Sequence, residues 1–319
     1  MFKHKVLQIL EENRGSEISG VFIAERLGVS RAAVCKAVAE LRSDGNAVES
    51  RRNGGYKLLK DSSAISDIGI KSLLKNQLPV YCYDRVDSTN TRAKMIALEG
   101  KEATALVVAD EQTEGRGRRG RSFFSPSGSG AYFSLLIKPE LTYAECQRVV
   151  PMTAVAVSRA IEKTCGIKTE IKWVNDLYFK GRKVCGIATE SIGDVSEPGP
   201  SALIVGIGIN VDTHLFPSEI ENKAGSLGVA INRNALIAAC VNEFFELFGH
   251  ICSNSFMNEY RKKCFVIGQK VKVLTEPPYE AIAEDVDNDG RLIVKNGDGK
   301  RVKLTTDEVS VLPIDLKGE

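Results

Sequence analysis

The sequence predicts a multidomain α+β protein, with a winged helix-turn-helix first, a mixed α/β domain in the centre and a small β domain last. Near the N-terminus, two helical patterns joined by a tight turn precede a short hairpin. Strand-like and helix-like segments then alternate through the centre. From Gly268 onwards, short strands separated by turn residues replace the helical patterns. We expect domains at residues 1–61, 66–265 and 266–319.

The N-terminal domain follows from three segments with helical spacing. Residues 2–13 form the first, SGVFIAERLG the second, and Ser30 is a natural N-cap for the third. The stretch Asn53-Gly54-Gly55 then predicts the turn of a hairpin, or wing. In such a domain the third helix enters the major groove and the wing touches the DNA backbone. The alternative is an ordinary three-helix cap with solvated charges. The expected DNA contacts are Ser30, Arg31, Ala32, Lys36, Arg51 and Arg52.

The charge distribution agrees with a polyanion partner at this end. The 319 residues are 43% hydrophobic and 26% charged, which is ordinary for a soluble globular protein. The net charge is only +2, but residues 1–60 hold 11 basic and 7 acidic residues, a net of +4. The remainder holds 32 and 34, a net of −2. The bias is modest, and it favours nucleic acid at the N-terminal domain.

Cysteine and histidine usage argues against metal and disulfide frameworks. The eight cysteines form no C-x-x-C pair, and only three histidines occur. Reduced thiols in a cytoplasmic protein are therefore expected. The N-terminus carries no long apolar run, so we expect neither a signal peptide nor a membrane partner.

The stretch Glu114–Arg121, EGRGRRGR, packs four arginines among three glycines. Burying four unpaired cations is implausible, so the stretch is either a solvated basic loop or an anion-binding loop. Its glycines also fit G-x-G-x-x-G, but that fingerprint requires a helix directly afterwards. SFFSPSGSGAYFSLLI follows instead, with Pro126 and a β-rich run. We therefore reject a dinucleotide-binding interpretation.

Four further segments place polar residues beside predicted strands. DSTN turns from a strand into a helix, where Ser88 or Thr89 is either an N-cap or a ligand-facing hydroxyl. KWVND (172–176) is either a charged strand edge or part of a site. Lys183 lies among apolar residues and either reaches solvent or enters a site. GIGIN ends a strand at Asn210, which is either a cap of the strand edge or part of a site, before a long loop of the kind that often covers ligands.

In combination, these segments resemble the biotin protein ligases of the bifunctional bacterial type, which also repress the biotin operon. The matching order is DSTN, EQTEGRGRRGR, KWVND, GRKVCGIATE and GIGIN, behind a winged helix and before a small β domain. The resemblance covers nearly the whole chain. It implies a central mixed α/β ligase domain of class II synthetase-like fold and a C-terminal SH3-like β-barrel.

The resemblance also implies a two-step reaction. Biotin and ATP, with Mg²⁺, form biotinyl-5′-AMP and release pyrophosphate. A lysine of the biotin carboxyl carrier protein of acetyl-CoA carboxylase, and possibly that of pyruvate carboxylase, then attacks the mixed anhydride. The adenylate acts as corepressor and favours a homodimer that binds palindromic operator DNA.

The family's functional residues map onto this sequence as follows. Catalysis is expected of Lys183, Arg118 and Arg116. Biotin binding is expected of Ser88, Thr89, Asn90, Gln112, Gly115, Arg116, Gly117, Arg118, Lys183 and Gly186. ATP and adenylate binding is expected of Arg118, Arg121, Phe123, Lys172, Asn175, Asp176 and Asn210. A magnesium ion arriving with ATP would contact Asp176.

The sequence departs from the family pattern at two positions, and two alternative functions are open. Phe123 replaces the family's usual tryptophan, and Val174 replaces a common proline, which affects adenylate stacking and turn geometry. A lipoate or octanoate ligase shares the central fold but normally lacks the leading winged helix. A non-catalytic biotin-sensing regulator is the other alternative, and the complete arginine loop with Lys183 disfavours it.

Overall fold

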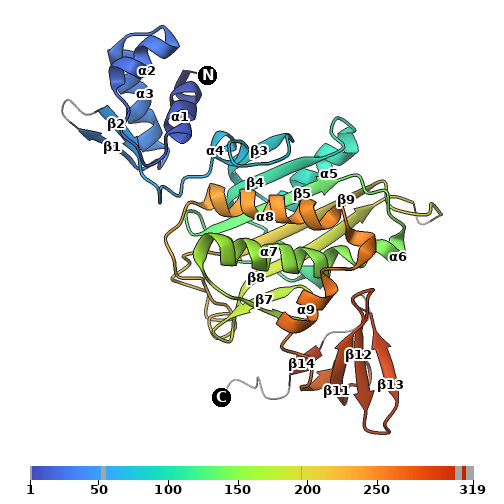
Figure 1. The fold of residues 1–319 in the computed structure, drawn as a ribbon. Helices are drawn as coiled ribbons and strands as arrows, with labels where there is room; N and C mark the ends of the chain where they lie inside the picture. The colour runs from blue at the N-terminus through green and yellow to red at the C-terminus, as the bar shows by residue number, and fades with distance from the viewer. Residues whose placement is uncertain (1, 52–54, 195, 306–310, 314–319) are drawn as a thin grey trace.

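The computed structural model describes residues 2–51, 55–194, 196–305 and 311–313. Figure 1 shows three bodies in chain order, with the helical N-terminal domain at one end, the large sheet in the middle and the small β domain at the other.

The N-terminal domain has the predicted order of elements: α1 (Phe2–Glu12), α2 (Gly20–Leu27), α3 (Arg31–Ser43), β1 (Val48–Arg51) and β2 (Gly55–Leu58). The side chain of Ser30 accepts a hydrogen bond from the Ala33 N–H, so it caps α3 as predicted. Strands β1 and β2 pair antiparallel as the wing. Apolar residues from all three helices and both strands form a core of their own. The winged helix-turn-helix prediction is confirmed.

A seven-stranded sheet organises the central domain. Its order is β3-β4-β5-β9-β8-β7-β6, in which only β3 and β4 pair parallel. The strands are β3 (Val80–Val86), β4 (Ala105–Gln112), β5 (Gly130–Ile137), β6 (Glu170–Lys172), β7 (Asp176–Phe179), β8 (Arg182–Ile192) and β9 (Ala202–Asn210). β5 and β9 are buried at every position, because helices cover both faces of the sheet.

The two faces of the sheet bury alternate residues of the same strand. Leu106 and Val108 of β4 join the core beneath α7 and α8, whereas Val107 joins a smaller cluster beneath α5. The helices are α4 (Asp67–Lys71), α5 (Thr89–Glu99), α6 (Tyr143–Cys146), α7 (Val149–Cys165), α8 (Arg233–Phe248) and α9 (Met257–Lys263). The helical region ahead of Pro151 is interrupted between α6 and α7, as predicted. Short 3₁₀ turns occur at Arg118–Gly120 and Ile251–Ser253.

The C-terminal domain is a five-stranded antiparallel sheet in the order β13-β12-β11-β10-β14, which confirms a small β domain. Its strands are β10 (Lys270–Val273), β11 (Tyr279–Val286), β12 (Leu292–Asn296), β13 (Arg301–Leu304) and β14 (Val311–Pro313). The turn residues at 276–278, 288–290 and 297–299 lie between β10 and β11, β11 and β12, and β12 and β13, as the sequence predicts.

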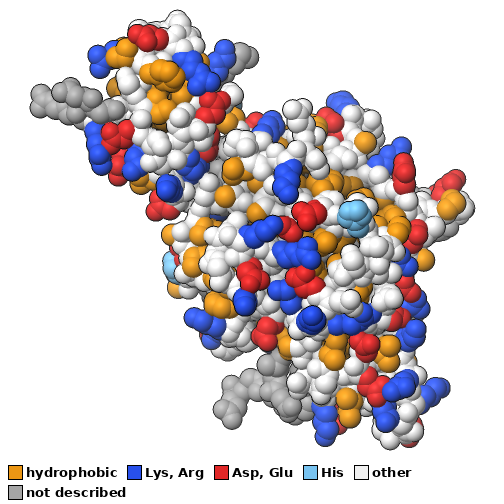
Figure 2. All heavy atoms as spheres, in the orientation of Figure 1, with side chains coloured by type: hydrophobic (Ala, Val, Ile, Leu, Met, Phe, Trp, Pro, Cys, Tyr) orange, Lys and Arg blue, Asp and Glu red, His pale blue; other side chains and the backbone are white. Residues whose placement is uncertain are grey.

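Acidic and basic side chains are interspersed over the face seen in Figure 2, without a continuous patch of one sign. Among the helices described, none is both long and apolar enough to cross a lipid bilayer.

Candidate functional site

Several strand ends bring the predicted site residues to one end of the central sheet. The register pairs Gly130, at the start of β5, with Asn210, at the end of β9. Strands β3 and β4 finish at the same end, because they are parallel to each other and β4 is antiparallel to β5. The arginine loop follows β4, and α5 begins directly after β3. Segments far apart in the sequence therefore converge here.

A cavity at this end is lined by nine of the ten predicted biotin residues. Gly115 is not part of this lining and is instead packed against the Phe123 backbone. A Cβ at Gly115 would lie 2.3 Å from the Phe123 carbonyl oxygen, so only glycine fits. The lining residues are Ser88, Thr89, Asn90, Gln112, Arg116, Gly117, Arg118, Lys183 and Gly186, with others of β8, β9 and the arginine loop.

A hydrogen-bond network fixes the floor of this cavity. The Thr89 N–H donates to Gln112 Oε1 at 2.8 Å, and Gln112 Nε2 donates to Ser125 Oγ at 2.9 Å. Ser134 Oγ lies 2.7 Å from both Thr89 Oγ1 and Asn90 Oδ1. The side chains involved are thus held in fixed orientations, as precise recognition of a polar ligand requires.

Ser88 occupies the N-cap position of α5, yet its side chain makes no capping hydrogen bond. It is 2% exposed and lines the cavity. Since the capping role is not used, the ligand-facing interpretation of Ser88 is favoured over the simple helix cap.

Glycines of β9 make room for two site residues. A Cβ at Gly206 would lie 2.2 Å from Asn90 Oδ1, and one at Gly208 would lie 2.5 Å from the Phe123 ring. The Phe123 ring meets Tyr132 edge to face, with centroids 6.3 Å apart. Phe123 therefore supplies an apolar wall where the family's tryptophan was expected.

The arginine loop is a tight hairpin. The Phe123 N–H donates to the Gly115 carbonyl at 2.8 Å, and the Gly117 N–H donates to the Arg121 carbonyl at 2.7 Å. At its tip, Arg119 adopts a left-handed conformation with φ 57°. The loop is followed by strand β5 and no helix, so the rejection of a dinucleotide fold is confirmed.

A second cavity adjoins the first and contains all seven predicted ATP residues. It shares Arg118, Phe123 and Lys183 with the first cavity, among others. The lining comprises Arg118, Arg121, Ser122, Phe123, Phe124, residues 172–176, Tyr178, Lys183, Asn210, Phe216, Glu219, Ile220, Lys223, Ala224 and Leu274. Two neighbouring ligands could thus meet beside Lys183.

The ion pair between Lys183 and Asp176 lies at this meeting point. Lys183 Nζ is 2.7 Å from Asp176 Oδ1. Asn175 donates from Nδ2 to Asp176 Oδ1 at 3.1 Å, and Arg118 donates to Asn175 Oδ1 at 3.3 Å. Residues Lys172 and Asp176 pair across a hairpin of β6 and β7, so Val174 preserves the turn.

Burial lowers the pKa of Lys172. The Asp176 carboxylate opposes this shift, whereas the nearby cations Lys183, Arg121 and Lys223 reinforce it. Burial is the main cause of the lowered pKa and the neighbouring cations add to it, so an anionic ligand beside Lys172 would favour its charged form.

The loop after Asn210 is pinned to the strand that carries Lys183. The Lys183 N–H donates to the Lys223 carbonyl at 2.9 Å, and the Gly225 N–H donates to the Lys183 carbonyl at 2.8 Å. Asn210 Nδ2 also donates to the Gly225 carbonyl at 2.8 Å. The predicted covering loop therefore borders the second cavity.

The C-terminal domain supports the KWVND hairpin through one turn. Trp173 Nε1 donates to the Gly290 carbonyl at 2.9 Å, and Arg148 forms an ion pair with Asp289 at 2.9 Å. Trp173 is 6% exposed. The turn between β11 and β12 thus braces the segment that carries Asn175 and Asp176.

Comparison with known proteins identifies the family. Residues 82–210 match the biotin/lipoate A/B protein ligase family, residues 3–57 an HTH domain and residues 266–312 the biotin protein ligase C-terminal domain. The bifunctional ligase/repressor BirA of Bacillus subtilis (strain 168) is 37% identical over 231 residues, which cover 70% of each chain. The chain belongs to the family of bifunctional biotin protein ligases.

Other members agree with this assignment. BirA of Escherichia coli (strain K12) is 28% identical over 289 residues, 87% of this chain and 88% of that one. The structure of the Aquifex aeolicus biotin protein ligase in complex with biotin and ATP aligns with TM-score 0.62 and 28% identity. That alignment covers 74% of this chain and 99% of that one.

The candidate DNA residues that the structure describes are exposed to solvent. Arg31, Ala32 and Lys36 are exposed along α3. Arg51 on the wing is exposed and pairs with Glu17 at 2.5 Å, so DNA would compete with that carboxylate. Arg52 lies outside the residues that the structure describes.

Several residues in and around the two cavities were not predicted from the sequence. Ser134 is the single polar residue in the run AYFSLLI, which was an available signal. Glu190 accepts a hydrogen bond from Asn90 at 2.8 Å, and Lys223 and Leu274 line the second cavity. The last two lie in segments without a distinctive pattern, so only tertiary structure reveals them.

We predict that Trp173→Phe loosens the contact between the C-terminal turn and the KWVND hairpin. The substitution keeps the ring buried but leaves the Gly290 carbonyl without its donor, which costs about 1–3 kcal/mol. Hydrogen exchange should accelerate in residues 173–176 and 286–291. Tyr178→Phe is the matched control, because no hydrogen bond from its hydroxyl is found among the described residues. Equal exchange in the two variants would contradict the brace.

Proposed function

We propose that this chain forms biotinyl-5′-AMP from biotin and ATP and transfers biotin to a lysine of the biotin carboxyl carrier protein. It also acts as a biotin-responsive repressor. The observation that carries this proposal is the pair of adjoining cavities that share Lys183, one with a rigid polar floor and the other with concentrated cations. The relatives named above are ligase/repressors, and the Aquifex aeolicus protein is a biotin protein ligase in complex with biotin, which favours biotin over lipoate.

The first cavity suits biotin. Hydroxyl and amide groups of Ser88, Thr89 and Gln112 match the donors and acceptors of a ureido ring, and the cavity leads towards Lys183. Arg116 and Arg118 reach the side of the cavity where the carboxylate would lie.

The second cavity suits ATP. Asn210 Oδ1 is buried and has no hydrogen-bond partner within the described part of the chain, so it could accept from the exocyclic amino group of adenine. Lys172, Arg121 and Lys223 would neutralise phosphates. Phe123 and Phe124 supply the apolar walls.

Catalysis then follows from charge neutralisation. The biotin carboxylate must approach the α-phosphate although both are anions. Lys183 and Arg118 border both cavities, so they would bind the two groups in attack geometry and stabilise the charge that develops on their oxygens. No covalent enzyme intermediate is needed.

Magnesium would be bound chiefly by the nucleotide. Among the described residues no cluster of three or more acidic, histidine or cysteine side chains forms a metal site, and Asp176 is already paired with Lys183. Asp176 would therefore supply at most one oxygen to an ion held by phosphates and water.

We further propose that the adenylate is the corepressor and that it favours a homodimer on operator DNA. The arginine loop faces Thr189 and Glu190 near the end of β8, which leads into the loop at residues 193–200. That loop contacts α6 through the Tyr143 hydroxyl, which donates to the Asp194 carbonyl at 3.1 Å. Ordering of both loops by the adenylate would complete one dimer surface.

We also propose domains at residues 1–61, 66–265 and 266–319, and a reducing, cytoplasmic setting for the protein. The hydrophobic cluster of the N-terminal domain is separate from that of the sheet, which supports the first boundary. All eight cysteines are free, which supports reduced surroundings.

We predict that Lys183→Ala abolishes adenylate formation while the protein stays folded. The loss should be about 10³-fold or more, because a cation beside both reacting groups is removed. Pyrophosphate release from biotin and ATP is the measurement. Lys180→Ala, on the same hairpin but outside both cavities, is the control. Normal pyrophosphate release by the Lys183 variant would refute this role.

We predict that kcat/KM for ATP falls at alkaline pH because Lys172 loses its proton. Its pKa is lowered in the folded protein, so its charge is present below that pKa and disappears at a lower pH than the charge of an exposed lysine. Lys172→Arg, which stays charged, should move the alkaline limb to higher pH. Lys168→Arg, an exposed lysine, should leave it in place. If the alkaline limb of the kcat/KM profile stays at the same pH in both variants, Lys172 does not take part in phosphate binding.

We predict that Arg119→Ala weakens the adenylate-dependent dimer more than it weakens biotin binding. Arg119 is exposed at the tip of the arginine loop, on the side proposed for the dimer surface. A loss of about tenfold in dimer affinity is expected. Sedimentation with and without adenylate measures it, with Arg301→Ala in the C-terminal sheet as control. An unchanged dimer constant would end this assignment.

A further inference from the structure

The segment that joins the winged helix to the sheet is held along its length. Its composition, KDSSAISD (60–67), predicts a polar linker. In the structure, however, most carbonyls from Leu59 to Ala64 accept hydrogen bonds from side chains of the two flanking domains. We call residues 59–66 the strap.

Arg14 holds the strap from the N-terminal domain. Its guanidinium donates to the carbonyls of Leu59 at 3.0 Å and Ser62 at 3.1 Å, and Glu11 fixes it through a bidentate ion pair. The Ser62 hydroxyl in turn accepts from the Ala47 N–H at 3.0 Å.

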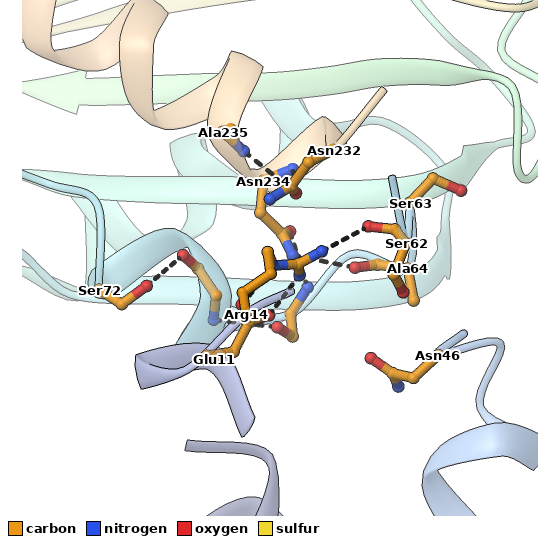
Figure 3. Close-up of polar contacts among 12 residues, drawn as sticks. Glu11, Arg14, Asn46, Ser62, Ser63, Ala64, Ser72, Asn232, Asn234 and Ala235 are labelled. Carbon is orange, nitrogen blue, oxygen red and sulfur yellow. Dashed lines mark hydrogen bonds and ion pairs between the residues drawn. The ribbon is translucent and has the colours of Figure 1, made fainter. Parts of the chain in front are cut away.

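Asn234 and Arg233, at the start of α8, hold the strap from the central domain. Asn234 is fully buried, and its amide accepts from the Ser66 N–H at 3.0 Å and donates to the Ala64 carbonyl at 3.0 Å. Arg233 donates to the Ser63 carbonyl at 2.8 Å. In Figure 3, Arg14 and Asn234 both lie beside the strap residues Ser62 to Ala64.

Arg233 ties this point to strands of the ligand site. It pairs with Asp110 of β4 at 2.7 Å and donates to the Gly130 carbonyl of β5 at 2.9 Å. Asp110 lies two residues before Gln112, and Gly130 pairs in register with Asn210. The strap is therefore held against strands of the central sheet and not against a surface loop.

A close junction at Gly69 leaves little freedom. A Cβ there would lie 2.5 Å from Asn234 Nδ2 and 2.7 Å from Glu11 Oε1, so both domains touch this glycine. Ile68 packs on the core of the winged helix and Ile70 belongs to the core of the sheet. Helix α4 thus fills the interface between the two domains.

We propose that Asn234 and Arg14 are positioning residues for repression: they fix the orientation of the winged helix on the ligase core. This inference rests on the proposed repressor function. A free tether of eight residues would spread over about 15 Å, whereas successive base pairs are about 3.4 Å apart. The strap removes that spread, so a dimer presents its two recognition helices at one half-site spacing. A dimer with this fixed spacing can bind both half-sites at once, so dimerisation increases the affinity for the operator.

The test compares two asparagines of α8 in the full-length protein. The side-chain amide of Asn242 also hydrogen-bonds two backbone groups. It accepts from the Lys75 N–H and donates to the Leu73 carbonyl, but it does not contact the strap. The DNA probes are a palindrome selected from random sequence by adenylate-bound wild type, its single half-site, and versions of altered spacing. Carrier biotinylation and dimer sedimentation are measured alongside.

For Asn234→Ala we expect about 10- to 100-fold weaker binding to the palindrome and a flattened dependence on spacing. Half-site affinity, carrier biotinylation and dimerisation should match those of Asn242→Ala. Arg14→Gln removes the hydrogen bonds that the N-terminal domain donates to the strap, so it should reproduce the effect. The same result in two variants cannot be explained by misfolding of only one of them.

Two results would overturn the inference, and they are distinguishable. If wild type selects no DNA, the repressor function fails and the positioning role fails with it. If wild type selects a palindrome and both strap variants keep its affinity and sharp spacing dependence, only the positioning role is wrong.

Discussion

Concentrated positive charge at one end of the central sheet is the constraint on which the rest depends. Arg118, Arg121, Lys172, Lys183 and Lys223 border one cavity, and only Asp176 and Glu219 oppose them among its acidic lining residues. Like charges this close repel one another when the cavity is empty, and this repulsion adds to burial in lowering the pKa of Lys172. It becomes favourable when two anionic groups enter, which is the requirement for joining a carboxylate to a phosphate.

The architecture supports this cluster from several sides. Glycines of β9 make room for Asn90 and Phe123, and the Gly290 turn of the C-terminal domain braces the KWVND hairpin. The loop after Asn210 is bonded to the backbone of Lys183 itself. Catalytic groups on packed strands are more precisely oriented than groups on free loops, so adenylate formation needs little rearrangement of the floor.

Much of this could be predicted from local sequence, because local patterns determine it. Helical spacing and the Ser30 cap predict the winged helix, and the arginines among glycines predict an anion-binding loop. The pairing of β5 with β9 could not be predicted, since these strands are separated in the sequence by two helices and three other strands. The strap illustrates the same limit: its small polar residues are typical of a flexible linker, whereas Arg14 and Asn234 hold it through contacts distant in sequence.

The two activities meet at the same sheet. The two cavities lie at the ends of β4 and β9, while Arg233 connects β4 and β5 to the strap below the winged helix. With the adenylate as the proposed corepressor, its transfer to the carrier would remove the corepressor from the protein, so ligation and repression would compete for one intermediate.

The most direct test of the central claim is a single turnover of the wild-type protein with biotin and ATP, without carrier. Neutralisation of the two anions in adjoining cavities predicts one equivalent of pyrophosphate released and biotinyl-5′-AMP retained on the protein. Binding of both compounds without any acyl nucleotide would contradict the account.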